Sequence, residues 1–383
     1  MPLLFLFFSR LWLTFVAVFI RFIMATLSFK RFLCTLLMSL LLVQMAAARR
    51  IGVLLPFGAP GKVGQTMVEF YRGFLMAADS VRAEGVSLEI YALDSGTTPA
   101  EMSDVLSRGS MAEMDCIVGP AVPAQAMVLA NFCKQRGIQL LMPFNTPVEA
   151  GKDYPSVFEN VAPQEVTYAG VSQLLLENFP DANYVFLVTG RRDARGTALQ
   201  QNLKKRLDAY GLYYRTLDVS VGYDAIPESL EKAHKNVILI DSPDEATLGS
   251  LSSYLLTLKD THPACDVSLV GFPEWLSFGS RITTQLHALD AYVFSTFYSN
   301  PLAGHALRFN QSYQGNFGQQ PLSVNPSIAM TGFDLGLFAM QSTGVKPLQH
   351  GFAFRQESTN GPYINHFVQL VHFQPNKIVN LMR

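Results

Sequence analysis

The sequence predicts an α/β protein with two doubly wound parallel sheets. The first observation is a strict alternation of short apolar runs with helical runs between Arg50 and Thr146, which includes RIGVLLPF, MVEFYRGFLMAADSVRAEG, VSLEIYALDSG, DCIVGP, AQAMVLANFCKQRG and QLLMPFNT. The second is that the alternation returns after Pro163 in a region of similar size that is not a sequence copy. Strands that alternate with helices form βαβ crossovers, and these produce a parallel sheet with helices on both faces.

In the first half, each expected strand ends in a turn-forming group. These groups are Pro56-Phe57-Gly58, Asp94-Ser95-Gly96, Gly119-Pro120 and Phe144-Asn145-Thr146. Ligands of open α/β sheets bind outside the carboxyl ends of the strands, so we expect the four turns to line one site.

The second half predicts its elements in the same alternating order. We expect helices over 164–180, 196–210, 227–234 and 244–260, strands over 184–188, 213–219, 236–240 and 266–270, then a strand over 290–297, helices over 304–317 and 327–342, and β-like runs over 351–355 and 366–373.

Residues 1–48 have the layout of a secretory signal. They contain no acidic residue, and the basic pair Lys30-Arg31 precedes the apolar run Phe32–Met45 and the small residues Ala46–Ala48. Met24 is a plausible true start. A retained anchor is the less favoured alternative, because a spanning helix needs about 20 residues. We therefore expect an exported protein of the periplasm or cell envelope.

The remaining 335 residues have the composition of a soluble two-lobed protein. They carry 25 basic and 30 acidic residues, which disfavours a nucleic-acid partner because such a partner requires a basic face. Their cysteines are Cys116, Cys133 and Cys265. Buried free thiols are the favoured interpretation, and a Cys116–Cys133 disulfide stays open as an alternative.

Several short motifs, taken in order, resemble one superfamily. They are IGVLLPF, YRGFLMAAD, CIVGP with the later LANFC, QLLMPFNTP, LVGFPEW, and a late pattern of Phe309, Tyr313, Phe317-Gly318 and Pro321 ahead of Gly332-Phe333-Asp334. Over roughly residues 50–383 the chain resembles the type I periplasmic binding proteins, the superfamily of leucine/isoleucine/valine-binding receptors.

The resemblance implies two Rossmann-like lobes joined by a three-crossing hinge, with a ligand clamped between them by hinge closure. Lobe 1 would comprise residues 50–162 plus 291–343, and lobe 2 residues 163–290 plus 344–383. The crossings would lie near Val161–Pro163, Asp290–Ser295 and Thr343–Pro347. Homodimerisation through the first lobe is known in this superfamily and stays open for this chain.

The candidate ligand-binding residues stand at the strand ends. They are Phe57, Ser95, Pro120, Gln125, Asn145 and Thr146 in the first lobe, and Tyr168, Asp193, Asp241, Glu274 and Trp275 in the second. Amino-acid receptors of the superfamily hold the α-carboxylate and α-ammonium with hydroxyls and backbone groups after the third and fourth strands. Here the turn Ala121–Gln125 has no serine or threonine, which makes a free amino acid doubtful, and the next turn keeps Asn145 and Thr146.

The acidic candidates have two interpretations. The favoured interpretation of Asp193 and Asp241 is that they cap the helices that follow them, and the alternative is that an acidic side chain pairs with a ligand ammonium. Glu274 and Trp275 together offer a charge and a stacking ring.

The sequence contains no recognisable catalytic motif. The run Gly58–Lys62 has two residues between its glycines, where a phosphate-binding loop has four, and Val63 replaces the required serine or threonine. No G-x-G-x-x-G follows a strand, no G-x-S-x-G is present, and the histidines lack metal-ligand spacing. We therefore expect no enzyme activity, no cofactor and no metal.

Two functions remain. The favoured one is a receptor that captures a small polar or amphipathic molecule and delivers it to an inner-membrane ABC permease. An apolar cleft formed by Phe57, Phe144, Phe272 and Trp275 fits either a ligand with a hydrophobic part or a cleft filled by side chains. The alternative is an envelope interaction module that keeps the fold and regulates cell-wall machinery without a transported ligand.

Overall fold

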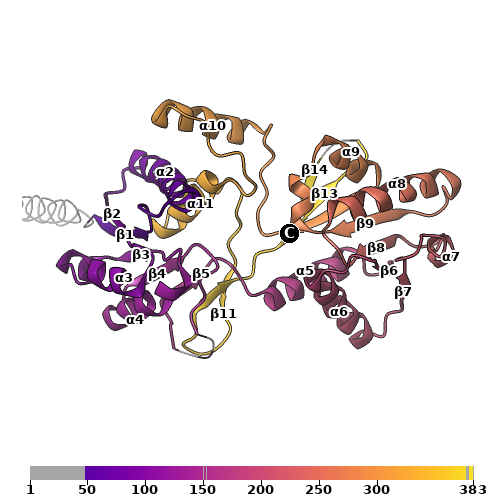
Figure 1. Cartoon of the computed structure of the whole chain (residues 1–383), viewed down its shortest axis with the longest axis horizontal. Helices are drawn as coiled ribbons and strands as arrows, with labels where there is room; N and C mark the ends of the chain where they lie inside the picture. Colours follow the sequence, from indigo (N-terminus) through magenta and orange to yellow (C-terminus); the bar gives the residue numbers. More distant parts are fainter. Residues whose placement is uncertain (1–47, 150, 152, 377–378, 383) are drawn as a thin grey trace, which may run out of the picture. The chain divides into compact units, whose positions relative to one another are not determined.

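A computed structural model describes residues 48–149, 151, 153–376 and 379–382. Residues 49–382 contain two seven-stranded sheets with flanking helices (Figure 1). Apart from Ala48, the expected leader and the candidate start Met24 lie outside the described residues. Within the described ranges, no helix is both long enough and apolar enough to cross a membrane.

The first sheet has the strand order β11-β12-β5-β4-β3-β1-β2, and all its pairs are parallel except β11 with β12. Its strands are β1 (Arg49–Leu55), β2 (Leu88–Asp94), β3 (Cys116–Val118), β4 (Gln139–Met142), β5 (Val157–Glu159), β11 (Phe354–Gln356) and β12 (Tyr363–Asn365). The helices of this first lobe are α2 (Lys62–Ala83), α3 (Pro99–Leu106), α4 (Ala126–Arg136), α10 (Gly304–Phe317) and α11 (Ile328–Ala339), with 3-10 turns η1 (Gly109–Glu113) and η2 (Pro123–Gln125).

Local sequence signals place the helices of the first lobe. Helix α3 begins at a capping box in which the Thr98 and Glu101 side chains bond each other's backbone N–H groups. Helix α4 ends at Gly137, whose φ of 67° is the left-handed conformation that favours glycine. Helices α2 and α11 cross closely, because a Cβ at Gly73 would overlap the Ala329 carbonyl oxygen.

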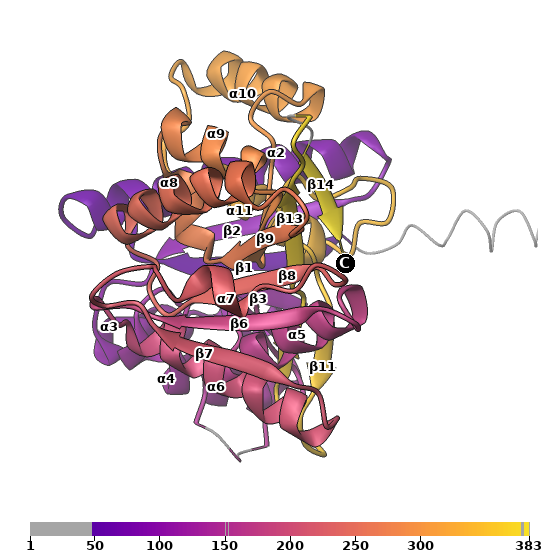
Figure 2. The same cartoon turned by 90° about the vertical axis from the view of Figure 1, so that its right-hand side faces the viewer.

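The second sheet has the order β14-β13-β10-β9-β8-β6-β7, and Figure 2 labels each of these strands except β10. Its strands are β6 (Asn183–Val188), β7 (Tyr214–Asp218), β8 (Asn236–Ile240), β9 (Val267–Gly271), β10 (Ala291–Ser295), β13 (Gln369–Phe373) and β14 (Val379–Met382). Strand β13 is antiparallel to both neighbours. The helices of this second lobe are α5 (Gln164–Asn178), α6 (Ala194–Ala209), α7 (Ile226–Ser229), α8 (Glu245–Thr261) and α9 (Ser280–Ala288), with the 3-10 turn η3 (Pro273–Ser277).

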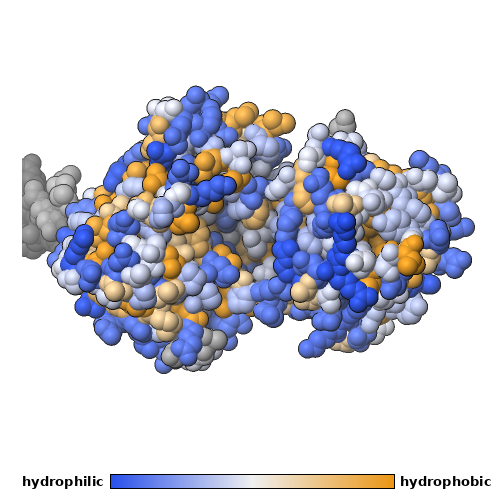
Figure 3. All heavy atoms as spheres, in the orientation of Figure 1, coloured by the Kyte–Doolittle hydropathy of each residue, from blue (hydrophilic) through white to orange (hydrophobic). Residues whose placement is uncertain are grey.

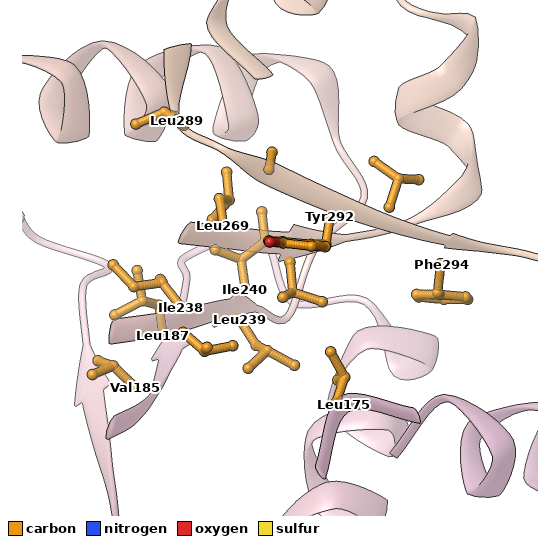
Figure 4. Packing of buried hydrophobic residues seen from close by; sticks show 14 of the residues in the cluster. Leu175, Val185, Leu187, Ile238, Leu239, Ile240, Leu269, Leu289, Tyr292 and Phe294 are labelled. Carbon is orange, nitrogen blue, oxygen red and sulfur yellow. The ribbon is translucent and has the colours of Figure 1, made fainter. Parts of the chain in front are cut away.

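Each lobe has its own apolar core. In the second lobe, Val185 and Leu187 of β6 pack with Ile238 of β8 and Leu269 of β9, all essentially inaccessible to solvent (Figure 4). These central strands are apolar on both faces, as expected for a parallel sheet covered by helices on both sides. The two Rossmann-like lobes that the sequence predicts are therefore present.

The strand pairing differs from the predicted lobe division at two places. Residues 291–295, expected in lobe 1, form β10 beside β9 in the second sheet. Residues 354–365, expected in lobe 2, contain β11 and β12 of the first sheet. The chain therefore crosses between sheets after β5, after β10 and after β12, rather than at 290–295 and 343–347.

Aromatic packing explains the position of β11 and β12. The rings of Phe158 on β5 and Tyr363 on β12 are stacked with centroids 4.7 Å apart. Phe354 on β11 lies 5.4 Å from Phe158 and 4.7 Å from Phe338 on α11. These rings bury apolar area against the first lobe, which favours pairing of the late strands with β5.

The three described cysteines, Cys116, Cys133 and Cys265, are free and buried, so the favoured interpretation is confirmed and the alternative Cys116–Cys133 disulfide is wrong. Burial raises the pKa of the Cys116 thiol to about 12.

Candidate ligand-binding site

Gln125 joins two turns at the carboxyl edge of the first sheet. Its side chain is fully buried on η2, and its amide nitrogen donates hydrogen bonds to the backbone carbonyl oxygens of Ser95, Gly96 and Thr98 at 2.8, 3.2 and 3.0 Å. The buried Ser95 hydroxyl lies 3.1 Å from the Gly96 carbonyl oxygen and 3.4 Å from Gln125 Oε1. The polar groups of Ser95 and Gln125 thus bind the protein's own turns.

The turn after β4 uses its hydroxyl in the same way. Thr146 is 2% exposed, and its Oγ1 lies 3.3 Å from the Pro120 carbonyl oxygen and 3.4 Å from that of Phe144. Asn145 is exposed, and its side chain makes no hydrogen bond within the described part of the chain. Of the polar candidates in the first lobe, Asn145 is the one that remains available to a ligand.

Asp241 holds two neighbouring strand ends of the second sheet together. Its side chain is 2% exposed, and Oδ1 accepts hydrogen bonds from the Thr189 amide at 2.9 Å and the Thr189 hydroxyl at 2.7 Å. The interpretation of Asp241 as a helix cap is wrong, because Asp244 caps α8 by accepting a bond from the Thr247 amide. Asp241 is instead a buried acceptor between β6 and β8.

Arg195 gathers the other two acidic candidates. Asp193 caps α6, accepting hydrogen bonds from the Arg195 amide at 2.8 Å and from Arg195 Nε at 3.1 Å. Glu274 of η3 forms an ion pair with the same guanidinium. The hydrogen bond from the Arg195 side chain lowers the pKa of Asp193. The two carboxylates therefore share one guanidinium, with which a ligand ammonium would have to compete.

The aromatic candidates divide by burial. Tyr168 is 6% exposed, its ring contacts Phe294 edge-on at 5.9 Å, and burial raises its pKa to about 12. Trp275 is 1% exposed and packs against Gly271 and Phe272, with its indole N–H lacking an acceptor among the described atoms. Phe57 is half-buried, with its ring 5.5 Å from that of Tyr71.

The structure therefore brings the predicted residues together in two sets. Ser95 contacts Gln125 and Thr146 contacts Pro120 in the first lobe, and Asp193 and Glu274 meet at Arg195 in the second. Among the described residues, no hydrogen bond or ion pair connects the two sets. Sequence reasoning missed Arg195, although its place two residues after a helix-capping aspartate was a usable signal.

A metal is not suggested by this arrangement. In the described ranges, no group of three or more His, Cys, Asp or Glu side chains has a geometry that could hold a metal ion.

No protein-family model matches this sequence, and no curated protein matches it. Solved structures do match its fold. A protein described as a branched-chain amino acid ABC transporter from Rhodospirillum rubrum is 12% identical with a TM-score of 0.58, and the match covers 87% of this chain and 99% of that one.

LpoA from Haemophilus influenzae gives similar values. Its C-domain, described as a regulator of PBP1A, is 13% identical with a TM-score of 0.54, and the match covers 87% of this chain and 100% of that domain. The full-length LpoA is 13% identical with a TM-score of 0.55, covering 88% of this chain and 59% of that one. These likenesses confirm the fold of the type I periplasmic binding proteins.

Proposed function

We propose that this chain is an exported interaction module of the cell envelope that does not capture a free amino acid between its lobes. One observation carries the proposal: the buried polar side chains expected to hold a ligand already bind groups of their own lobe. Ser95, Gln125, Thr146 and Asp241 are each at most 2% exposed and hydrogen-bonded locally. The preference between the two functions is therefore the reverse of the one that the sequence alone favours.

Energetics supports the proposal. A ligand that recruited Gln125 or Asp241 would have to break buried hydrogen bonds, and a buried group left without a partner costs about 1–3 kcal/mol. Arg195 already forms ion pairs with both Asp193 and Glu274, so a ligand ammonium would have to compete with its guanidinium, although the three groups together keep one net negative charge.

Exposed apolar side chains near α10 offer a surface for a protein partner. Leu302, just before the helix, is 80% exposed, and Leu307 within it is 45% exposed. Figure 3 shows apolar atoms among polar ones over this part of the molecule. The LpoA C-domain, which has the same fold, is described as a regulator of another protein.

The proposal is tested by purifying residues 49–383 under native conditions, denaturing them and analysing any released compound by mass spectrometry. We expect no stoichiometric small molecule and no thermal shift with amino acids. Because a ligand at 100 times its dissociation constant stabilises by about 2.7 kcal/mol, a true ligand would be visible. One released compound per chain would overturn the proposal.

A second experiment tests for a protein partner by placing a photo-cross-linking residue at position 302 in cells. We expect one discrete adduct that a Leu307→Glu substitution abolishes, and no equivalent adduct from a cross-linker at the exposed Gln201 on α6. Equal labelling from both positions would contradict a specific surface near α10.

A solute receptor serving an ABC permease is the second candidate. It is favoured by the likeness to the Rhodospirillum rubrum protein over 99% of that chain, and by the availability of Asn145. In this second candidate function, the two lobes would close about the three crossings, and the ligand would contact residues at the strand ends. Substitution of Asn145 and Thr146 together by alanine should weaken binding of any ligand that mass spectrometry identifies, and an unchanged affinity would place the site elsewhere.

A further inference from the structure

A cavity on the first lobe shares only Phe57 with the candidate ligand-binding residues. It lies between the β1–α2 turn, one face of α2 and the segment 319–322, and its volume is about 510 Å³. Most ligand pockets have volumes of about 300–1,000 Å³, so it could hold a molecule the size of a short peptide.

Buried contacts fix the walls of this cavity. Glu69 on α2 is 2% exposed; its Oε1 accepts a hydrogen bond from the Leu322 amide at 2.9 Å, and its Oε2 accepts one from the Tyr313 hydroxyl. A Cβ at Gly64 would overlap the carbonyl oxygen of Ala59, so the β1–α2 turn packs directly on the first turn of α2. A preformed cavity reduces the entropy lost on binding.

Arg72 supplies a positive charge to the cavity. Its guanidinium lies 5.4 Å from the centroid of the Phe317 ring and within hydrogen-bond reach of the Tyr313 hydroxyl, and no described carboxylate lies within ion-pair distance of it. An arginine held by an aromatic ring and lacking an acidic partner retains donors that fit the two oxygens of a carboxylate.

The lining also contains two carboxamides and several apolar groups. Gln65 and Gln319 are exposed, and their side chains make no hydrogen bonds within the described part of the chain. Each carboxamide offers one carbonyl acceptor and N–H donors, the same groups that a peptide bond pairs with. Phe57 and Leu322 present apolar surface beside them.

We propose that this cavity binds the carboxylate end of a short peptide or of another N-acylated amino acid. Arg72 binds the carboxylate, Gln65 and Gln319 pair with the adjacent amide group, and Phe57 with Leu322 contacts an apolar side chain. A free amino acid is disfavoured, because its ammonium would need an acceptor and Glu69, the carboxylate of the lining, is buried with both oxygens in use. The inference does not rest on the proposed function.

The test compares N-acetyl-alanyl-leucine with its C-terminal carboxamide by isothermal titration calorimetry on residues 49–383. We expect the acid to bind with a dissociation constant of about 0.2 mM, as for a ligand of about 17 non-hydrogen atoms. The carboxamide should bind about tenfold more weakly or worse, because it loses the charge-assisted pair.

Variants locate the binding. Arg72→Gln should abolish the difference in affinity between the acid and the carboxamide. Gln319→Leu should weaken the binding of both compounds, and it carries little risk to folding because Gln319 is exposed. Arg308→Gln is the matched control, since Arg308 is an exposed arginine of α10 that lines a neighbouring hollow and has no ion-pair partner among the described residues.

Three results would overturn the proposal. They are equal affinity for acid and carboxamide, no binding of the acid at about fifty times the expected dissociation constant, and an equal loss from Arg308→Gln and Arg72→Gln. If free leucine bound as tightly as the acetylated compound, the claim that the cavity disfavours a free amino acid would be wrong. None of these results bears on the mass-spectrometric test of the interlobe site.

Discussion

The role of Gln125 can be decided by a substitution that keeps its shape and removes its hydrogen bonds. Gln125→Met has nearly the same length and volume, but its thioether cannot donate to the carbonyl oxygens of Ser95, Gly96 and Thr98. The Gly96 and Thr98 oxygens keep other donors, namely the Ser95 hydroxyl and the Met102 amide. The Ser95 carbonyl oxygen has no other donor among the described groups.

The magnitude follows from these contacts. Losing two bonds to oxygens that keep a donor costs about 0.5–1 kcal/mol each, and orphaning the buried Ser95 oxygen costs about 1–3 kcal/mol, so the variant should be about 3 kcal/mol less stable. If the first lobe unfolds as a unit of about 150–200 residues, this corresponds to a fall in Tm of about 6–12 °C.

The assay is urea denaturation followed by circular dichroism, with Gln135→Met as the control. Gln135 is an exposed residue of α4, so its substitution should change stability by less than about 0.5 kcal/mol. A Gln125→Met variant as stable as the control would refute the reasoning, because the loss of three buried hydrogen bonds must lower the free energy of unfolding. Such a result, together with lost ligand binding, would return Gln125 to the ligand site.

Three further outcomes are expected. Gly73→Ala should lower the free energy of unfolding by about 1–3 kcal/mol in urea melts, because its Cβ would overlap the Ala329 carbonyl oxygen. Gly315→Ala should raise it by about 0.5–1 kcal/mol, because the space around this position on α10 is open. Equal effects of the two substitutions would contradict the close crossing of α2 and α11. Burial raises the pKa of Asp290, but hydrogen bonds from Lys235 and His372 outweigh burial and hold the pKa below its usual value. Its charge therefore stabilises above the unfolded pKa of about 3.9, and this contribution is lost as pH falls through the folded pKa. Asp290→Asn should thus be less stable at pH 7 by about 2 kcal/mol, with the deficit shrinking below about pH 4, and a deficit independent of pH would argue against the ion pairs. Cys116, Cys133 and Cys265 of residues 49–383 should not react with Ellman's reagent until guanidinium unfolds the protein, and rapid native labelling would contradict their burial.

The sequence predicted those features that depend on neighbouring residues. Helix α10 has the bounds 304–317 that its periodicity indicates, and Asp193 caps α6 as an aspartate at a helix start commonly does. The strands of each parallel core were identifiable because they are short, apolar and bounded by turn residues.

Contacts between distant segments could not be predicted in the same way. The amide of Gln125 reaches carbonyl groups 27–30 residues earlier in the chain, and the end of β1 lies between β3 and β2 in the strand order. The three-residue β5 is too short to show a period, and the sheet to which β11 and β12 belong depends on rings contributed by Phe158 and Phe338. Arg195 is an intermediate case, because its bond to Asp193 is local, whereas its ion pair with Glu274 depends on a contact that only folding creates.

The three passages of the chain between the sheets also constrain biosynthesis. The first sheet begins at Arg49 but receives β12 only at residues 363–365, and the second begins at Asn183 but receives β14 at 379–382. A nascent polypeptide can therefore finish the first sheet only after residue 365 has been translated, and the second only after residue 382. Incomplete sheets with open edges invite association with other chains, so both sheets are exposed to such association until their last strands have been added. For the same reason, no single contiguous fragment can be expressed as an intact lobe.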